Sequence, residues 1–190
     1  MIKNSQLPNQ CTSFYSSIPR KNHAPPAKIS IIGTPAVGKT TLTKLMRGQQ
    51  LSMKYSPTMG FNLGKTNFKG QNIRIWDFGG QKAYLRQQLS KYVHGSDIIF
   101  IVTDSTPKNV LTTRELLEHS RNLVEESCEI VAIANKQDLP GHMSPKRVED
   151  VLQIPTFPMV AIDPENREHM LGLITTLMNH IQARKTGGDY

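Results

Sequence analysis

The run GTPAVGKT occupies residues 33–40 and decides the fold of this 190-residue chain. An apolar stretch, residues 29–32, precedes it, and a helical pattern over residues 39–47 follows it. A Gly-x-x-x-x-Gly-Lys-Thr run between a strand and a helix lets backbone N–H groups and the positive end of the helix dipole converge on phosphate oxygens. A chance glycine-rich turn would rarely be flanked in this way, so we predict a phosphate-binding loop.

Each position of this loop has its own expected task. Gly33 permits the tight turn, and Gly38 permits close approach of the backbone to the phosphates. The Lys39 ammonium would lie near the terminal phosphates, and the Thr40 hydroxyl can ligate Mg²⁺. Pro35 is unusual here because it has no N–H to donate and its ring stiffens the loop. The motif alone does not distinguish ATP from GTP.

A second motif, NKQD at residues 135–138, follows the apolar stretch 130–134. Ligands of open sheets bind at the carboxyl ends of the strands, which is where this loop is expected. The Asp138 carboxylate can accept from two adjacent N–H donors of guanine, an arrangement that adenine does not present. Asn135 can bridge the base and the phosphate loop, and the stem of Lys136 can lie against the ring. The motif predicts guanine recognition.

A third motif, WDFGGQ at residues 76–81, is suited to the terminal phosphate. Asp77 ends a predicted strand, where a carboxylate can hold Mg²⁺ through a water molecule. The Gly80 N–H can donate to the terminal phosphate, and Gln81 can orient an attacking water. Thr58 lies between the first helix and the second strand and is a candidate second hydroxyl ligand for Mg²⁺. Together the motifs predict a site for GTP or GDP with Mg²⁺.

Short apolar strands alternate with helical stretches from residue 28 onward, which is typical of an α/β domain with a parallel sheet wrapped by helices. Gly70 separates two strands that we expect to pair as an antiparallel hairpin. The predicted strands are residues 29–32, 61–69, 71–78, 97–103, 129–134 and 157–162. The predicted helices are residues 39–47, 109–126, 144–152 and 166–183.

The domain boundaries follow from composition. Residues 1–27 are rich in Ser, Asn, Gln and Pro and predict a flexible extension; residues 28–183 form the domain, and residues 184–190 a tail. The longest apolar run, residues 98–102, is far shorter than the ~20 residues that span a bilayer. Secretory and lipidation signals are not evident. We therefore expect a cytoplasmic protein, neither secreted nor membrane-spanning, with peripheral membrane contact left open.

The charge is unevenly distributed along the chain. The first 76 residues hold eleven Lys or Arg and no Asp or Glu, whereas the remainder hold twelve basic and fifteen acidic residues, for a net charge of +8. Such asymmetry is typical of a surface for anionic lipid, nucleic acid or an acidic partner, although a scattered, solvated excess explains it equally well. No aromatic-rich basic groove is apparent, so we do not expect nucleic acid as a partner.

The motifs resemble those of the small GTPases of the Ras superfamily, most closely the Arf branch. PTMGFN at residues 57–62, WDFGGQ, and NKQDLP at residues 135–140 are similar to the Arf versions almost letter for letter. The resemblance covers residues 28–183. It implies a P-loop NTPase fold, or G domain, with three α/β/α layers, six mostly parallel strands with one antiparallel edge strand, and about five helices. It also implies two switch segments, near residues 49–61 and 78–92.

The resemblance also completes the set of predicted site residues. It implies GTP/GDP and Mg²⁺ as cofactors, Thr40, Thr58 and, through water, Asp77 as metal ligands, and Gln81 as the catalytic residue. The nucleotide-binding residues would be Gly33, Pro35, Ala36, Val37, Gly38, Lys39, Thr40, Thr41, Tyr55, Thr58, Gly80, Asn135, Lys136, Asp138, Ala161 and Ile162.

Some positions depart from the family pattern. The amphipathic, myristoylated N-terminal helix of the Arf branch is not evident. Tyr55 looks more like the Ras pattern, in which this tyrosine closes over the nucleotide. Ala161 can still offer a backbone N–H to the base, but Ile162 replaces the usual Lys or Thr. Heterotrimeric G-protein alpha subunits carry an arginine where this chain has Tyr55, so we expect slow intrinsic hydrolysis that a partner's arginine accelerates.

The sequence thus predicts a monomeric molecular switch that hydrolyses GTP slowly. Its expected partners are effector, exchange-factor and GTPase-activating proteins. One alternative is a GTP-loaded scaffold with little turnover, since Pro35 alters the phosphate loop. The other is a switch that docks on anionic membrane through its basic N-terminal portion.

Overall fold

A single six-stranded sheet organises the computed structural model, which describes residues 26–52, 57–68 and 70–186. The strand order is β2-β3-β1-β4-β5-β6, and every neighbouring pair is parallel except β2 and β3. The strands are β1 (Ala27–Ile32), β2 (Phe61–Phe68), β3 (Gln71–Phe78), β4 (Ile98–Thr103), β5 (Glu129–Ala134) and β6 (Thr156–Pro158). The predicted sheet, with its antiparallel hairpin at the edge, is confirmed.

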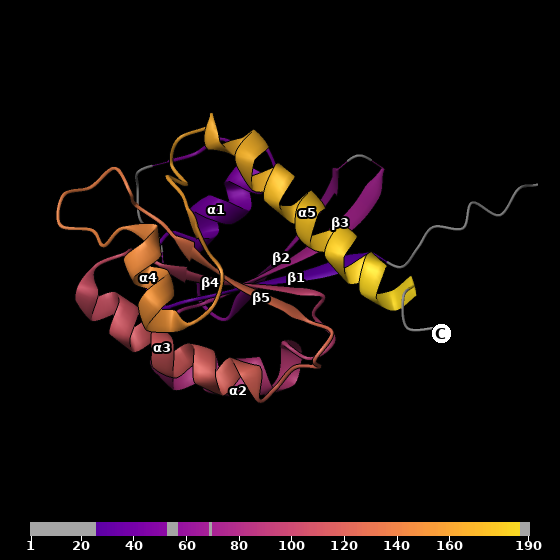
Figure 1. Cartoon of the computed structure of the whole chain (residues 1–190), viewed down its shortest axis with the longest axis horizontal. Coiled ribbons are helices and arrows are strands. Elements are labelled where there is room, and N and C mark those ends of the chain that lie inside the picture. Colours follow the sequence, from indigo (N-terminus) through magenta and orange to yellow (C-terminus); the bar gives the residue numbers. More distant parts are fainter. Residues whose placement is uncertain (1–25, 53–56, 69, 187–190) are drawn as a thin grey trace, which may run out of the picture.

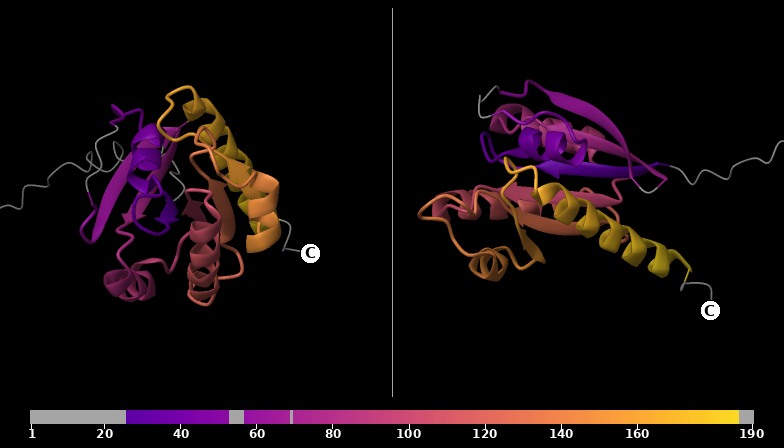
Figure 2. Two further views of the ribbon diagram at one scale, coloured as in Figure 1. Left: turned by 90° about the vertical axis from the view of Figure 1, so that its left-hand side faces the viewer. Right: turned by 90° about the horizontal axis from the view of Figure 1, so that it is seen from above.

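Helices cover both faces of this sheet (Figures 1 and 2). One core cluster joins the sheet to α1 and α5, and the other joins it to α2, α3 and α4. The helices are α1 (Lys39–Met46), α2 (Lys82–Tyr92), α3 (Pro107–Arg121), α4 (Pro145–Leu152) and α5 (Asn166–Thr186). All six residues of β4 are buried, as expected for a central strand that is covered on both faces. The predicted three layers and five helices are confirmed.

The chain order places a crevice at the carboxyl ends of the central strands. β1 lies between β3 and β4. The helix that follows β1 packs on one face, whereas the helix that follows β4 packs on the other. The loops that leave these two strands therefore diverge, which is the arrangement at which open α/β sheets bind their ligands.

The hydrophobic pattern of the sequence did not lead us to predict a helix at α2. Leu85, Leu89 and Val93 are four residues apart and fully or almost fully buried, so the helical signal is present between polar residues. Tyr92, at the end of α2, packs its ring 4.8 Å from Phe61 and 5.7 Å from Trp76, measured between ring centroids. These contacts tie the helix to the β2–β3 hairpin.

Boundaries of two elements, the last strand and the third helix, were also wrong. The last strand ends at Pro158 rather than continuing to residue 162, because proline has no N–H for the ladder and the chain then turns into a loop. The third helix begins at Pro107, two residues earlier than expected, because the Thr106 side chain accepts from the Asn109 N–H and caps it. It ends at Arg121 rather than at residue 126.

Candidate functional site

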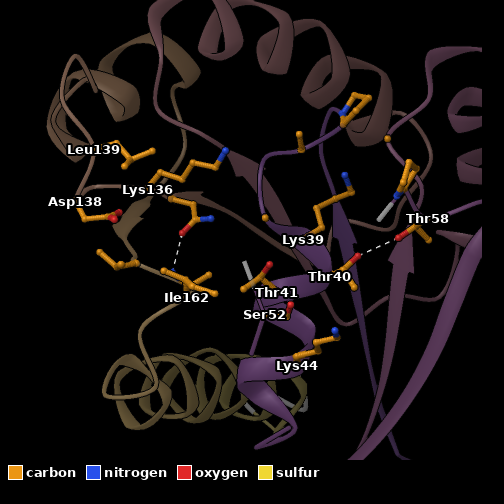
Figure 3. Close-up of a pocket in the computed structure, with 18 of the residues that line it drawn as sticks. Lys39, Thr40, Thr41, Lys44, Ser52, Thr58, Lys136, Asp138, Leu139 and Ile162 are labelled. Atoms are coloured by element: carbon orange, nitrogen blue, oxygen red, sulfur yellow. Dashed lines mark hydrogen bonds between the residues drawn. The ribbon is translucent and has the colours of Figure 1, made fainter. Parts of the chain in front are cut away.

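A cavity of about 400 Å³ opens at the carboxyl ends of β1, β3 and β5 (Figure 3). This size suits a small-molecule ligand. Among the predicted site residues, it is lined by Pro35, Ala36, Gly38, Lys39, Thr40, Thr41, Thr58, Gly80, Gln81, Asn135, Lys136, Asp138, Ala161 and Ile162. The fold thus brings three separate motifs together around one space.

The remaining predicted residues lie elsewhere. Gly33 and Val37 are buried behind the cavity wall, and Asp77 is fully buried beneath it. An added Cβ at Gly33 would collide with the Val102 carbonyl of β4, so the first turn of the loop requires glycine. Tyr55 lies outside the described residues.

The phosphate loop contains two residues with positive φ. Gly38 has φ of 102°, a conformation that L side chains rarely adopt, and Ala36 has φ of 63°. The Lys39 side chain, only 6% exposed, folds back so that its Nζ donates to the Thr34 carbonyl at 2.7 Å. Burial lowers the pKa of Lys39 to about 8, against the opposing effect of the Asp77 carboxylate. An ammonium has three donors, so this group can also serve phosphate oxygens.

Three oxygen-bearing side chains meet at one end of the cavity. Thr40 donates from its hydroxyl to Asp77 Oδ2 at 2.7 Å, and its Oγ1 lies 3.0 Å from that of Thr58. Asp77 Oδ1 is buried without a hydrogen-bond partner in the described part of the chain. Burial raises the pKa of Asp77, while the Thr40 hydrogen bond and the Lys39 charge lower it. Hydroxyl and carboxylate oxygens are ligands that Mg²⁺ prefers, so this cluster fits that ion.

Two glycines let the chain after β3 reach the phosphate loop. The Gly79 N–H donates to the Gly60 carbonyl at 2.7 Å, and an added Cβ at Gly79 would lie 2.5 Å from the Thr58 carbonyl oxygen. An added Cβ at Gly80 would collide with the peptide that joins Thr34 to Pro35. Glycine at both positions therefore allows the predicted terminal-phosphate motif to touch the phosphate loop and the Thr58 segment together.

Gln81 is exposed beside this contact. It begins α2 as its N-terminal flanking residue, and its side chain makes no capping hydrogen bond to the helix. Its Nε2 lies 3.7 Å from the Met59 sulfur. The amide therefore lines the cavity without being bound into the helix, which leaves it able to orient a small molecule there.

Asn135 joins the two ends of the cavity. Its Nδ2 donates to the Val37 carbonyl at 2.8 Å, and its Oδ1 accepts from the Ala161 N–H at 2.9 Å. The side chain is 3% exposed. The bridge to the phosphate loop agrees with the prediction, but the Ala161 N–H already has a partner within the protein. A contact from this N–H to a base stays a prediction.

The rest of the base motif lies at the opposite end of the cavity from Thr58 (Figure 3). Lys136 adopts φ of 62°, and Gln137 turns away from the cavity to donate to Ser105 Oγ at 2.8 Å. Asp138 is exposed, and within the described ranges its carboxylate accepts no hydrogen bond. The carboxylate is therefore open to a ligand.

Sequence reasoning missed several residues of the site. Lys44, Ser52, Leu139 and Val160 also line the cavity. Thr34 and Asn109 support it from behind through a hydrogen bond of 2.7 Å between their side chains. Lys44 lies four residues after the GTPAVGKT motif and Leu139 within NKQDLP, so both could have been found by proximity. Asn109 carries no sequence signal, since an asparagine in the first turn of a helix is common.

Over the residues that the structure describes, none of its helices is both long and apolar enough to cross a membrane. In the same ranges, no group of three or more His, Cys, Asp or Glu side chains could hold a metal ion. The Thr40, Thr58 and Asp77 cluster has one carboxylate and two hydroxyls and is a candidate site of a different kind.

Comparison with known proteins identifies the family. Residues 14–178 match the ADP-ribosylation factor family. The chain is 35% identical over 137 residues to ADP-ribosylation factor-like protein 5 of Caenorhabditis elegans, covering 68% of this chain and 73% of that protein. It is 32% identical over 156 residues to ADP-ribosylation factor J of Dictyostelium discoideum, covering 79% and 80%. Together with the G-domain fold and the three motifs around one cavity, these matches show that the chain belongs to the ADP-ribosylation factor family of small GTPases.

Proposed function

We propose that this GTP-binding protein is a slow, Mg²⁺-dependent molecular switch whose residues 57–60 and 78–81 respond to the terminal phosphate of GTP. The observation that carries the proposal is the continuous cavity from Thr40 and Thr58 to Asp138. A guanine nucleotide would lie along it, with phosphates at the loop of residues 33–40. Such switch segments become ordered around the terminal phosphate and are released after hydrolysis.

The proposed chemistry takes place at the phosphate end of the cavity. Lys39 and the loop N–H groups hold the phosphates and stabilise the charge that develops during hydrolysis. Thr40 and Thr58 would hold Mg²⁺ through their hydroxyls and Asp77 would hold it through water, and the ion would neutralise phosphate charge. Gln81 orients the attacking water.

We further propose that intrinsic hydrolysis is slow. Within the described residues, no arginine lines the cavity, so this part of the chain supplies no guanidinium for the transition-state charge. An arginine supplied by an activating protein is worth ~10³ to 10⁵ in rate. Small GTPases of this family act with regulators and effectors in general.

Substitution of Asp138 by Asn tests the base assignment. The variant keeps one acceptor oxygen but places an NH₂ donor against one of the two guanine donors, so its affinity for guanine nucleotides should fall by about 100-fold or more, while affinity for xanthine nucleotides should rise. The measurement is titration with fluorescent GDP and XDP. Exposed Asp150 on α4 is a matched carboxylate control, and Asp150→Asn should leave both affinities unchanged. Equal guanine affinity in Asp138→Asn and the natural protein would remove Asp138 from the base site.

Substitution of Gln81 by Leu tests turnover. Binding of GTP should be preserved, and single-turnover hydrolysis should fall by at least about tenfold, because the water loses its orienting amide. Exposed Gln87, further along α2, provides the control Gln87→Leu. Intrinsic hydrolysis faster than about one per second in the natural protein would contradict the slow-switch proposal.

A GTP-loaded scaffold is the second candidate, and the contact of Gly80 with the Thr34–Pro35 peptide favours it. Pro35 offers no N–H at this point, where the terminal phosphate is proposed to lie. Unhydrolysed GTP on the purified protein after hours at its working temperature would support the scaffold. The membrane contact predicted for the basic N-terminal portion stays a prediction, and residues 1–25, 53–56 and 69 of that portion lie outside the described residues.

A further inference from the structure

Asn109 on α3 contacts the phosphate loop although it lies outside the cavity lining. Its Nδ2 donates to Thr34 Oγ1 at 2.7 Å, across 75 positions of sequence. We propose that Asn109 is a positioning residue for GTP, which acts through Thr34 to hold Lys39 and Gly80 at the terminal phosphate. The proposal rests on the proposed GTPase function and adds a residue that none of the three motifs contains.

The orientation of the Asn109 amide follows from its neighbours. Its Oδ1 lies 2.7 Å from the Thr103 hydroxyl and 3.4 Å from the Asp104 N–H. A backbone N–H can only donate, so the oxygen must face this side. The Thr103 hydroxyl accepts from the Ser105 N–H at 3.2 Å and therefore directs its own hydrogen to Asn109. The NH₂ group is left to face Thr34.

Thr34 is the point where three parts of the site meet. Its hydroxyl is held by Asn109, and its carbonyl accepts from the Lys39 ammonium at 2.7 Å. The peptide that follows it packs directly against Gly80. Thr34 itself is 9% exposed, so this arrangement is largely shielded from water. A shift of Thr34 would therefore move both groups that are proposed to contact the terminal phosphate.

This geometry predicts different effects on the affinities for GTP and GDP. Lys39 and Gly80 are proposed to serve the terminal phosphate, whereas the base lies at the far end of the cavity with Asp138. Loss of the Thr34 hydroxyl should thus weaken GTP binding more than GDP binding. A general loss of stability would affect the two nucleotides alike.

The test replaces Thr34 by Val, which is similar in shape but has no hydroxyl, and compares it with Thr34→Ser, which keeps one. In Thr34→Val the ratio of GTP to GDP affinity should fall about two- to tenfold, the scale of one buried hydrogen bond. Single-turnover hydrolysis should slow by a similar factor. Thr34→Ser should stay close to the natural protein.

Thr113 offers a matched structural control. Its buried hydroxyl donates to the same Asn109 Oδ1 at 3.2 Å but does not touch the phosphate loop. Thr113→Val should lower the melting temperature while leaving the affinity ratio unchanged. In a double-mutant cycle, Thr34→Val should add little to Asn109→Ala, because both remove one interaction.

The proposal is overturned if Thr34→Val matches Thr34→Ser, if Thr113→Val shifts the affinity ratio as much, or if the cycle is additive. These outcomes leave the GTPase function intact. Failure of the natural protein to bind or hydrolyse GTP would instead overturn the proposed function. Melting temperatures are measured for every variant, and affinities are measured on the folded protein.

Discussion

The two ends of the cavity are held together in different ways. At the base end, both polar groups of the Asn135 side chain are paired with backbone groups, the Val37 carbonyl and the Ala161 N–H. At the phosphate end, one oxygen of buried Asp77 has no partner in the described residues, and the Thr58 hydroxyl lies 3.0 Å from that of Thr40. The chain itself braces the base end through Asn135 and leaves the exposed Asp138 carboxylate for a ligand, whereas at the phosphate end a buried carboxylate oxygen of Asp77 is left unpaired. The difference is consistent with a fixed recognition site joined to a responsive one.

Among substitutions that test this difference between the two ends, Asn135→Ala should have the largest effect. It leaves a buried carbonyl and a buried N–H without their partner, at a cost of about 2–4 kcal/mol in the free energy of unfolding. Affinity should fall by at least about tenfold for GTP and GDP alike, because the bridge supports the whole cavity. Denaturant unfolding and nucleotide titration measure the two effects.

Gln137→Ala is the control for this change. Its side-chain amide also holds the same loop, through hydrogen bonds to Ser105 Oγ and to the Met143 carbonyl, but these bonds do not involve the phosphate loop. It should lower stability without an equal loss of affinity. An Asn135→Ala protein that binds GDP normally would contradict the preformed base end.

Asp77→Asn should have the next largest effect and act at the phosphate end alone. The amide can still accept from Thr40, but it loses the charge proposed to attract Mg²⁺ through water. We expect a loss of about 10- to 100-fold in Mg²⁺ affinity, the range found for outer ligands of metal sites. The rate of GDP release, measured with and without a chelator, should become nearly independent of Mg²⁺.

Asn62 is the cross-strand neighbour of Asp77 and is exposed, so Asn62→Ala is a control on the same strand pair. It should retain the full response to the chelator. An Asp77→Asn protein that responds as strongly as the natural one would show that the cluster does not hold the ion.

Thr58→Val should have the smallest effect, but it should distinguish the two ends of the cavity most clearly, because it should act on GTP and hardly on GDP. Thr58 lies beside Thr40, so its hydroxyl is proposed to join the metal ligands around the terminal phosphate. Its loss should weaken GTP by about tenfold and GDP little, while Thr58→Ser should bind both normally. Equal weakening of both nucleotides would mean that Thr58 supports the fold rather than the responsive end.

The fold was largely predictable because strand and helix patterns are local. The hairpin around Gly70 and the buried strand over residues 129–134 were both recognised from short runs of side chains. The helix α2 was missed because buried Leu85 and Leu89, with Val93 just after the end of the helix, are embedded in polar sequence within a segment interpreted as a switch. The last strand was drawn too long because apolar residues 159–162 also pack in a loop.

The sequence by itself determined the chemistry of the site, because each motif carries its own donors, acceptors and backbone requirements within a few residues. Gly38 with its positive φ and Lys39 beside it belong to this class. Only the tertiary structure decided which distant groups meet, such as Asn135 with the Ala161 N–H and Asn109 with Thr34, 75 positions apart. Hydrogen bonds act over about 3 Å, and the order of strands in the sheet, rather than any local pattern, sets that distance.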